Sequence, residues 1–361
     1  MREAFVVDDR RLAFDPVAHP PPAQSDGVPF PTEEWPIDEL PGDVHLLDLA
    51  ATAFDPEGPL HDTYAVAIAA GWYSGGVAGC SPSGMVRGSR SSGRPRSRPG
   101  RWPSPCSTPW SEYWSTRAGW RWMIRRRCPG GTDPGEPCRA ITLRHLLEMR
   151  DGLEFTGDIV DAETSDVMKM LFGEGQTDVA AFAADRPPPA NPVERFSYSS
   201  GTGNVISGIV AREVGPGQPY RRFLGQRPFS PLGMASATAA SDDVGTWVAA
   251  SYVYATAQDY ARFGLLYLRD GMWNGRRLLP DGWADQGHPP RSVDPDDGML
   301  DGVHWWIRED RLGTYWAAGH EGQFIDICPA SDLVVVRLGK TLTEQSADVE
   351  RRRVEVAEAF A

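Results

Sequence analysis

The distribution of apolar and polar residues divides the chain into three parts with different patterns. Near the end of residues 1–70, the alternating stretch YAVAIAAG is typical of a β-strand. From residue 139 the pattern is regular again, and AITLRHLLEMRDGLEF has the apolar spacing of an amphipathic helix with Thr142 as its N-cap. Residues 71–138 show neither period. The pattern therefore predicts ordered structure on both sides of an irregular middle segment.

The middle segment, residues 71–138, also differs from the rest of the chain in composition. Between Ser81 and Arg127 there are eleven arginines and a single acidic residue, and six of the chain's 13 tryptophans fall in the segment. Arginine, glycine, serine and proline favour a disordered basic insertion, although tryptophan and cysteine are unusual in disorder. Arginines on phosphates and tryptophans on bases would suit a nucleic-acid-binding arm, although no RGG-type repeat is visible. Translation of a GC-rich gene in the wrong frame would also give this composition.

The genetic code allows a test of the third interpretation. When the frame of WPSPCSTPWSEYWST and the four residues PGRW is shifted back by one base, the codons permit Trp-Ser-Met-Ala-Lys-Ser followed by an apolar helix. Degenerate codons permit this reading without requiring it. It nevertheless combines a Ser-x-x-Lys sequence with a buried helix in one frame. The sequence analysis therefore favours a middle segment that is translated out of frame, which the nucleotide sequence would decide.

The totals limit the class of protein. A chain of 361 residues can form one large domain or two of ordinary size. A net charge of −13 argues against a nucleic-acid binder, or a binder of anionic membranes, when the protein is taken as a whole. No apolar stretch approaches a membrane span, and MREAFVVDDRRLAFDP contains no apolar signal core. We therefore expect a soluble, cytoplasmic protein.

The five cysteines are an odd number, which fits a reduced compartment better than a disulfide framework. Four of them, Cys80, Cys106, Cys128 and Cys138, fall in or at the end of the middle segment. Their spacings match no zinc-binding template, so no metal site is expected there.

Three stretches of residues 139–361 resemble the β-lactamase-related serine hydrolases, which include class C β-lactamases, DD-peptidases, esterases and 6-aminohexanoate-dimer hydrolases. ITLRHLLEMRDGL resembles the helix that leads into the central region of this family. ERFSYSSGTGN resembles its Tyr-x-Asn/Ser element, and AAGHEGQFIDICPASDLVVVRLGKT resembles its Lys-Thr-Gly strand in a His-x-Gly variant. Each motif alone is weak, but their order, spacing and linking text agree with the family.

The resemblance implies a set of site residues. It makes Tyr198 the catalytic tyrosine, places Ser200 at the third position of the same element, and places His320 and Gly322 on a strand along the site. The backbone N–H of Gln323 would be one oxyanion donor. A tyrosine can relay a proton if nearby cations lower its pKa. Taken alone, the residues around Tyr198 would more often form a simple turn before the helix NVISGIVAREVG. A lone histidine such as His320 is usually structural.

The first motif of this family, Ser-x-x-Lys, is missing. It supplies the nucleophilic serine and a lysine that helps to take its proton. The chain has two lysines, Lys169 and Lys340, and neither lies three residues after a serine. The resemblance implies a hydrolase of amide or ester bonds that acts on a small molecule through an acyl-serine, with no metal or cofactor. We expect the chain as written to be inactive; the alternative is a non-catalytic binding protein that keeps the hydrolase shell.

The resemblance also implies an α/β (α+β) fold of the β-lactamase/transpeptidase type, with an antiparallel sheet flanked by helices and a mostly helical region. Residues 1–70 would supply the first strand, residues 139–270 the helical region and residues 271–361 the remaining strands and the C-terminal helix. Residues 71–138 would be poorly ordered, would leave a pocket open where the serine helix belongs, and would make the fold marginally stable.

Overall fold

The computed structural model describes most of the chain from residue 141 onward. The described residues are 21–26, 28–35, 52–55, 58, 60, 62–70, 141–157, 163–187, 191, 194–287, 289–341 and 343–361, together with the strand pairing of residues 76–77, 80–81 and 84–85. Apart from these three short strands, the predictions for residues 71–138 lie outside the described residues.

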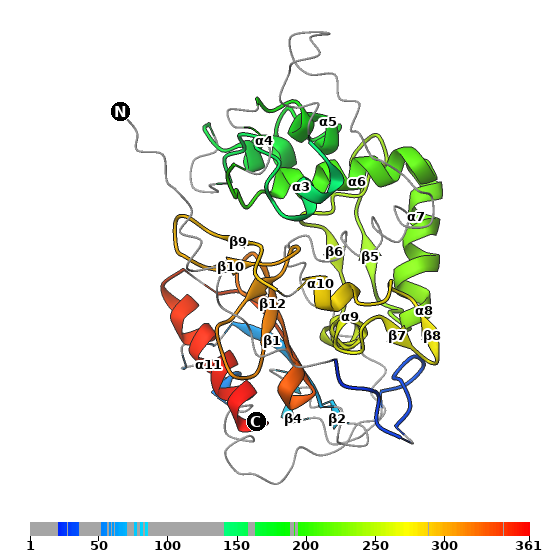
Figure 1. Cartoon of the computed structure of the whole chain (residues 1–361), viewed down its shortest axis with the longest axis vertical. Helices are drawn as coiled ribbons and strands as arrows, with labels where there is room; N and C mark the ends of the chain where they lie inside the picture. Colours follow the sequence, from blue (N-terminus) through cyan, green and yellow to red (C-terminus); the bar gives the residue numbers. More distant parts are fainter. Residues whose placement is uncertain are drawn as a thin grey trace.

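An antiparallel sheet forms the centre of the molecule (Figure 1), as the resemblance implied. Its longest strands are β1 (Thr63–Ala70), β14 (Leu333–Gly339), β13 (Gln323–Cys328) and β12 (Tyr315–Gly319), in that order across the sheet. Beyond β12 follow β11 (Trp306–Ile307), β10 (Leu300–Asp301) and β9 (Ser292–Val293). Beside β1 lie β2 (Gly76–Val77), β3 (Cys80–Ser81) and β4 (Gly84–Met85). Strand β1 therefore pairs with β14, which follows it in the chain by more than 260 residues.

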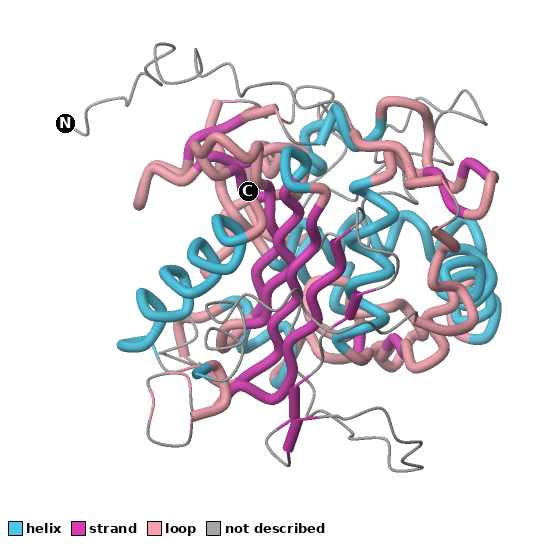
Figure 2. The backbone as a smooth tube through the Cα atoms, turned by 90° about the horizontal axis from the view of Figure 1, so that it is seen from below, coloured by secondary structure: helices cyan, strands magenta, loops and turns pink. Residues whose placement is uncertain are grey.

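Strand β14 is buried along its whole length because both faces of the sheet are covered. Val334 and Val336 belong to the same core cluster as helix α9 (Ala257–Leu268), whereas Leu333 and Val335 belong to the cluster of helix α11 (Ser346–Ala359). This alternation follows from the two-residue period of a strand. Figure 2 shows α11 and the other helices on opposite sides of the strands.

Helix α9 lies unusually close to the sheet because of Gly264. A Cβ atom at this position would come within 2.6 Å of the Val334 side chain and 3.2 Å of the Ile325 side chain. The absence of a side chain thus lets the backbone of α9 reach the sheet. Although α9 lies within residues 139–270, it packs on the sheet rather than with the helical region.

A second group of helices lies above the sheet in Figure 1. It consists of α3 (Leu143–Leu147), α4 (Asp166–Phe172), α5 (Val179–Ala184) and α6 (Ser200–Val214), whereas α7 (Gln218–Leu224) lies at the right of that view and shares the core cluster of α9. The first four share a separate apolar core. As predicted, Thr142 caps α3: its side chain accepts the N–H of His145, and the His145 ring accepts the N–H of Thr142 in return. His145 therefore completes a capping box at the start of α3.

Short elements complete the chain. They are the π-helix η3 (Gly225–Phe229), α8 (Ser230–Leu232), β5 (Thr238–Ala239), β6 (Val253–Tyr254), β7 (Met272–Trp273), β8 (Arg276–Arg277), α10 (Trp283–Gly287), and the 3-10 helices η4 (Pro329–Ser331) and η5 (Thr343–Gln345). Within the part of the chain that the structure describes, no helix has both the length and the apolar character to cross a bilayer.

Candidate functional site

The position of Tyr198 is fixed by the start of α6. Ser199 is the N-cap of this helix, and its hydroxyl accepts hydrogen bonds from the N–H groups of Gly201, at 3.0 Å, and Thr202, at 3.3 Å. The Thr202 hydroxyl donates in turn to the buried carboxylate of Asp151 at 2.6 Å. Ser200 is the first residue of the helix and is half-buried. The helix N-terminus is thus held firmly, and Tyr198 lies directly before it.

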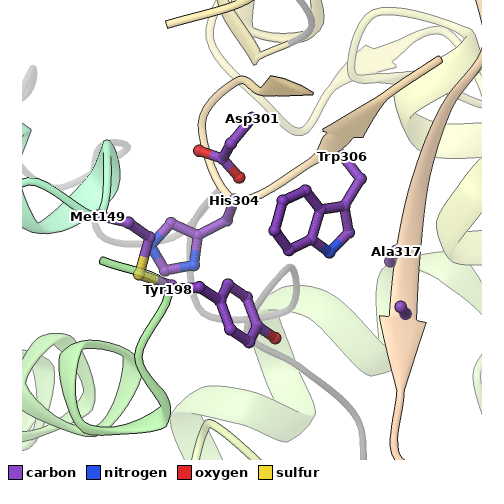
Figure 3. A pocket seen from close by; sticks show the side chains of 7 residues that line it. Met149, Tyr198, Asp301, His304, Trp306 and Ala317 are labelled. Carbon is purple, nitrogen blue, oxygen red and sulfur yellow. The ribbon is translucent and has the colours of Figure 1, made fainter. Parts of the chain in front are cut away.

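The Tyr198 ring lies in a small pocket between the helical region and the sheet (Figure 3). The residues that line this pocket are Met149, Tyr198, Asp301, His304, Trp306, Ala317 and Ala318. The centroids of the Tyr198 and Trp306 rings are 5.2 Å apart, with the ring planes tilted by 36°. Although protein surrounds Tyr198, 39% of its surface is exposed. Part of the Tyr198 residue therefore remains accessible.

The phenol of Tyr198 is held in its neutral form. Burial raises its pKa above the ordinary value, and the nearby Asp301 carboxyl raises it further. None of the described residues that line the pocket is a lysine or an arginine. A role for Tyr198 as a proton acceptor would require a cation to lower its pKa, as the missing lysine does in the resemblance.

His304 lies beside Tyr198 and is buried and neutral. Its Nε2 lies 3.2 Å from the Leu146 carbonyl oxygen; because a carbonyl can only accept, Nε2 carries the proton and Nδ1 keeps a free lone pair. Burial lowers the pKa of His304 to about 4, although the hydrogen bond to Leu146 opposes the shift. Although buried, His304 lines the pocket.

Asp301 is the second buried titratable group of the pocket, and 1% of its surface is exposed. Burial raises the pKa of its carboxyl well above the ordinary value, and the carboxyls of Asp294 and Glu148 add to the shift. Its Oδ1 has no hydrogen-bond partner, and neither has Nδ1 of His304. In Figure 3 the Asp301 carboxyl points toward the His304 ring, and one ring nitrogen of His304 lies on the side of Tyr198. Two buried polar atoms therefore remain unsatisfied next to Tyr198.

The expectation of a strand through the His-x-Gly motif is wrong. His320, Glu321 and Gly322 form the turn between β12 and β13. Glu321 and Gly322 have φ angles of +60° and +81°, and consecutive left-handed residues end a strand. The His320 side chain is 36% exposed, and its Nε2 lies 4.0 Å from Oε1 of Glu321.

Gly322 and Gln323 are tied to the neighbouring strand. Arg337 of β14 donates from Nη1 to the Gly322 carbonyl oxygen at 2.6 Å. The Gln323 side chain donates to the Gly339 carbonyl and accepts the Gly339 N–H at 3.1 Å. The amide of Gln323 is thus used inside the sheet, so only its backbone N–H is left for the oxyanion role that the resemblance implies.

Strand β12 connects the two halves of the expected site. Its residues Ala317 and Ala318 line the Tyr198 pocket, and His320 follows two residues later. At a rise of about 3.3 Å per residue, the backbone of His320 lies roughly 7 Å beyond Ala318. The structure thereby brings the region of residues 198–200 to the end of β12 where residues 320–323 lie.

No sequence pattern marked Asp301, His304 or Trp306 as site residues. They lie on the two-residue strands β10 and β11 and their connection, which are too short for a periodic pattern. His304 also has a φ of +62°, which a histidine adopts far less readily than a glycine. As for metals, the residues that the structure describes contain no group of three histidine, cysteine or acidic side chains that could hold an ion.

Comparison with known proteins identifies relatives. The family model described as Beta-lactamase matches residues 107–359, more than half of the chain. A 6-aminohexanoate-dimer hydrolase of Paenarthrobacter ureafaciens is 28% identical over 153 residues, which cover 40% of this chain and 38% of that protein. The match therefore spans less than half of that relative's length.

Solved structures share the fold. The penicillin-binding protein from Bacillus halodurans has a TM-score of 0.60 and 17% identity, covering 87% of this chain and 100% of that one. The D-stereospecific amidohydrolase from a Streptomyces species has a TM-score of 0.57 and 16% identity, covering 84% of this chain and 98% of that one. At these identities the likeness concerns the fold alone.

Proposed function

Because the chain belongs to the beta-lactamase family, we propose that it descends from a serine hydrolase that cleaves an amide or ester bond of a small molecule through an acyl-serine intermediate. The relatives by name include an amidohydrolase and a 6-aminohexanoate-dimer hydrolase, which favours an amide. In this proposal Tyr198 moves the proton of the nucleophile and Ser200 lies at the third position of its element. His320 and Gly322 border the site, and the N–H of Gln323 binds the oxyanion.

One observation carries the proposal most directly. Tyr198 precedes a firmly capped helix, and its pocket is lined by the strand that ends at Gly319, directly before His320. Two motifs separated by more than 100 residues thus lie at one end of the same strand. The partly exposed Tyr198 leaves room for a substrate next to both.

We also propose that this chain is inactive because its middle segment is translated out of frame. A serine hydroxyl needs a base within hydrogen-bond reach, and the raised pKa of Tyr198 leaves its phenol protonated. The match to the family model begins at residue 107. That position comes just after residues 100–104, where the shifted frame permits Ser-x-x-Lys.

The test compares the chain as written with a chain translated from a gene in which the frame of residues 71–138 is restored. Both are treated with a fluorophosphonate probe and a fluorescent β-lactam. We expect a label on the repaired chain alone, attached to the serine of the restored motif. A Tyr198→Phe change in the repaired chain should slow labelling by about a hundredfold or more.

Three outcomes would contradict the proposal. A nucleotide sequence that does not encode Ser-x-x-Lys in the shifted frame removes the frame argument. A labelled serine in the chain as written removes the inactivity. A repaired chain that folds but takes no label removes the serine-hydrolase function and leaves a binding protein with a hydrolase shell.

A further inference from the structure

The pocket beside Tyr198 contains more polar chemistry than the proposed reaction uses. Oδ1 of Asp301 and Nδ1 of His304 are both buried without a hydrogen-bond partner. An unsatisfied buried polar atom is destabilising, so two that line one small pocket call for a partner. Neither residue belongs to the motifs that the family resemblance assigned.

The backbone around the pocket is also strained. His304 has a φ of +62° and Met149 a φ of +51°, and both line the pocket. Non-glycine residues in this region of φ are strained and occur often at ligand sites. The strain places the His304 ring between the Leu146 carbonyl, which accepts the hydrogen bond of its Nε2–H, and the side of the pocket where Tyr198 lies.

The two unsatisfied atoms call for the same kind of partner. Nδ1 of His304 can only accept a hydrogen bond because Nε2 carries the proton. The Asp301 carboxyl, which is protonated in the empty pocket, also only accepts once that proton has left. The rings of Tyr198 and Trp306 line the same pocket, and aromatic faces attract cations. A group with several donors, no acceptor and a positive charge satisfies all of these together.

The free space limits the size of that group. The pocket has a free volume of about 10 Å³, which is close to the room that one water molecule needs. A primary ammonium head has similar dimensions and three donors. A quaternary ammonium is too large, and a carboxylate would meet two acceptors.

We propose that Asp301 and His304 bind the primary ammonium group of an amine-bearing substrate, with Asp301 as the counter-ion and Nδ1 of His304 as a second acceptor. The part of this proposal that concerns the substrate rests on the proposed hydrolase function. It adds that the acyl or leaving group of the substrate carries a free amine near Tyr198. The part that concerns binding holds for the chain as written.

Binding is accompanied by the loss of a proton from Asp301. In the empty pocket, burial and the negative charges of Asp294 and Glu148 keep the carboxyl protonated. The amine enters as an ammonium ion at neutral pH, so an ion pair with Asp301 requires the carboxyl proton to leave to the buffer. His304 stays neutral, and the phenol of Tyr198 stays protonated. One proton is therefore released for each amine bound.

The experiment is isothermal titration calorimetry of the full chain at neutral pH with n-propylammonium chloride, in two buffers of different ionisation enthalpy. The difference between the buffers gives the number of protons released. We expect saturable binding with close to one proton released. The analogue 1-propanol should bind at least about tenfold more weakly because it is neutral. The tetramethylammonium ion should also bind at least about tenfold more weakly because it is too large.

Three variants separate the pocket from the rest of the protein. Asp301→Asn keeps the shape and should weaken binding about tenfold to a hundredfold with no proton release, because it removes a charge-assisted hydrogen bond. His304→Asn suits the positive φ and should weaken binding about fivefold. Asp297→Asn removes the same charge from an exposed position in the neighbouring loop and keeps the acceptor for the Met299 N–H, so its affinity should equal that of the wild type.

Two results would overturn the proposal. If 1-propanol binds as well as n-propylammonium, the pocket recognises only an apolar chain. If Asp301→Asn and Asp297→Asn bind the amine alike, or if no heat of binding is seen, the two polar atoms enclose a water molecule only. Neither result bears on serine labelling of the repaired chain, so failure of this inference differs from failure of the proposed function.

Discussion

The Tyr198 ring packs against the Trp306 ring with 5.2 Å between their centroids, and this contact joins the start of α6 to strand β11. Trp306 also contacts Phe196, with centroids 6.3 Å apart, and Trp316 of β12, with centroids 6.1 Å apart. One buried indole thus touches residues on both sides of the pocket. The orientation of the candidate tyrosine depends on it.

Trp306→Ala should destabilise the fold strongly. Removal of a buried aromatic side chain leaves a cavity and costs about 3–5 kcal/mol, and 7% of Trp306 is exposed. Urea denaturation of the wild type and variant measures the loss. Phe172→Ala is the control because this ring is 56% exposed, and we expect a change below about 1 kcal/mol. Equal losses would show that Trp306 does not hold the two parts together.

The stability of the protein should decrease in mild acid because of His304. The imidazole has a pKa of about 4 in the folded state and an ordinary value of 6.5 when unfolded. Between these values the unfolded chain binds a proton that the folded chain does not, so stability is complete above pH 6.5 and falls as the pH drops toward 4. The loss attributable to this group is about 3 kcal/mol.

The test uses His304→Asn, which removes the titration. Free energies of unfolding are measured for both proteins at pH 7.5, 5.5 and 4.5. The wild type should lose more stability than the variant over this interval, since carboxyl groups elsewhere affect both alike. Parallel curves would mean that His304 takes up its proton in the folded protein as readily as in the unfolded chain.

The sequence predicted the long elements well. The alternation in YAVAIAAG became β1, the cap at Thr142 was confirmed, and the family resemblance supplied β14 and α11. These elements have apolar periods long enough to be recognised or motifs with characteristic order. The antiparallel sheet with helices on both faces was expected for the same reason.

The local geometry of the pocket could not be predicted in this way. The turn at residues 320–322 interrupts a stretch that reads as one strand, because a positive φ at Glu321 leaves no mark on apolar periodicity. Asp301 and His304 are close to Tyr198 through strand pairing between β10, β11 and β12. Such long-range pairing is decided by the whole sheet and not by neighbouring residues.

Asp301 should make the protein less stable as the pH rises. Its pKa is raised in the folded state, so above the ordinary value near 3.8 the unfolded chain loses a proton that the folded chain keeps. Each pH unit between the two values costs about 1.4 kcal/mol. Asp301→Asn should therefore be more stable than the wild type at pH 7 and nearly equal to it at pH 3.

Urea denaturation at the two pH values checks this sign, with Asp297→Asn as a control for a lost exposed charge. An Asp301→Asn protein that is less stable than the wild type at pH 7 would show that the carboxylate is ionised and paired in the folded state. In that case the pocket would already contain its cation.

Gly322→Ala should disrupt the turn at the end of the site. Its φ is +81°, and a Cβ would come within 2.7 Å of both Arg337 Nη1 and Thr341 Oγ1. The guanidinium cannot retreat easily, because it is buried and held by the Gly322 carbonyl and by Thr63, whose Oγ1 is 2.9 Å from Nη2. We expect a loss of about 2–4 kcal/mol from strain and overpacking together.

Gly217→Ala separates these two contributions. Gly217 has a φ of +70°, but a Cβ there would meet no atom within 4 Å. Its substitution should cost only the backbone strain, about 1 kcal/mol, and chemical denaturation of the two variants gives the difference. If both variants lose the same stability, the crowding by Arg337 is relieved at no cost. The turn at residues 320–322 would then be free to move relative to β14, which is incompatible with a fixed oxyanion donor at Gln323.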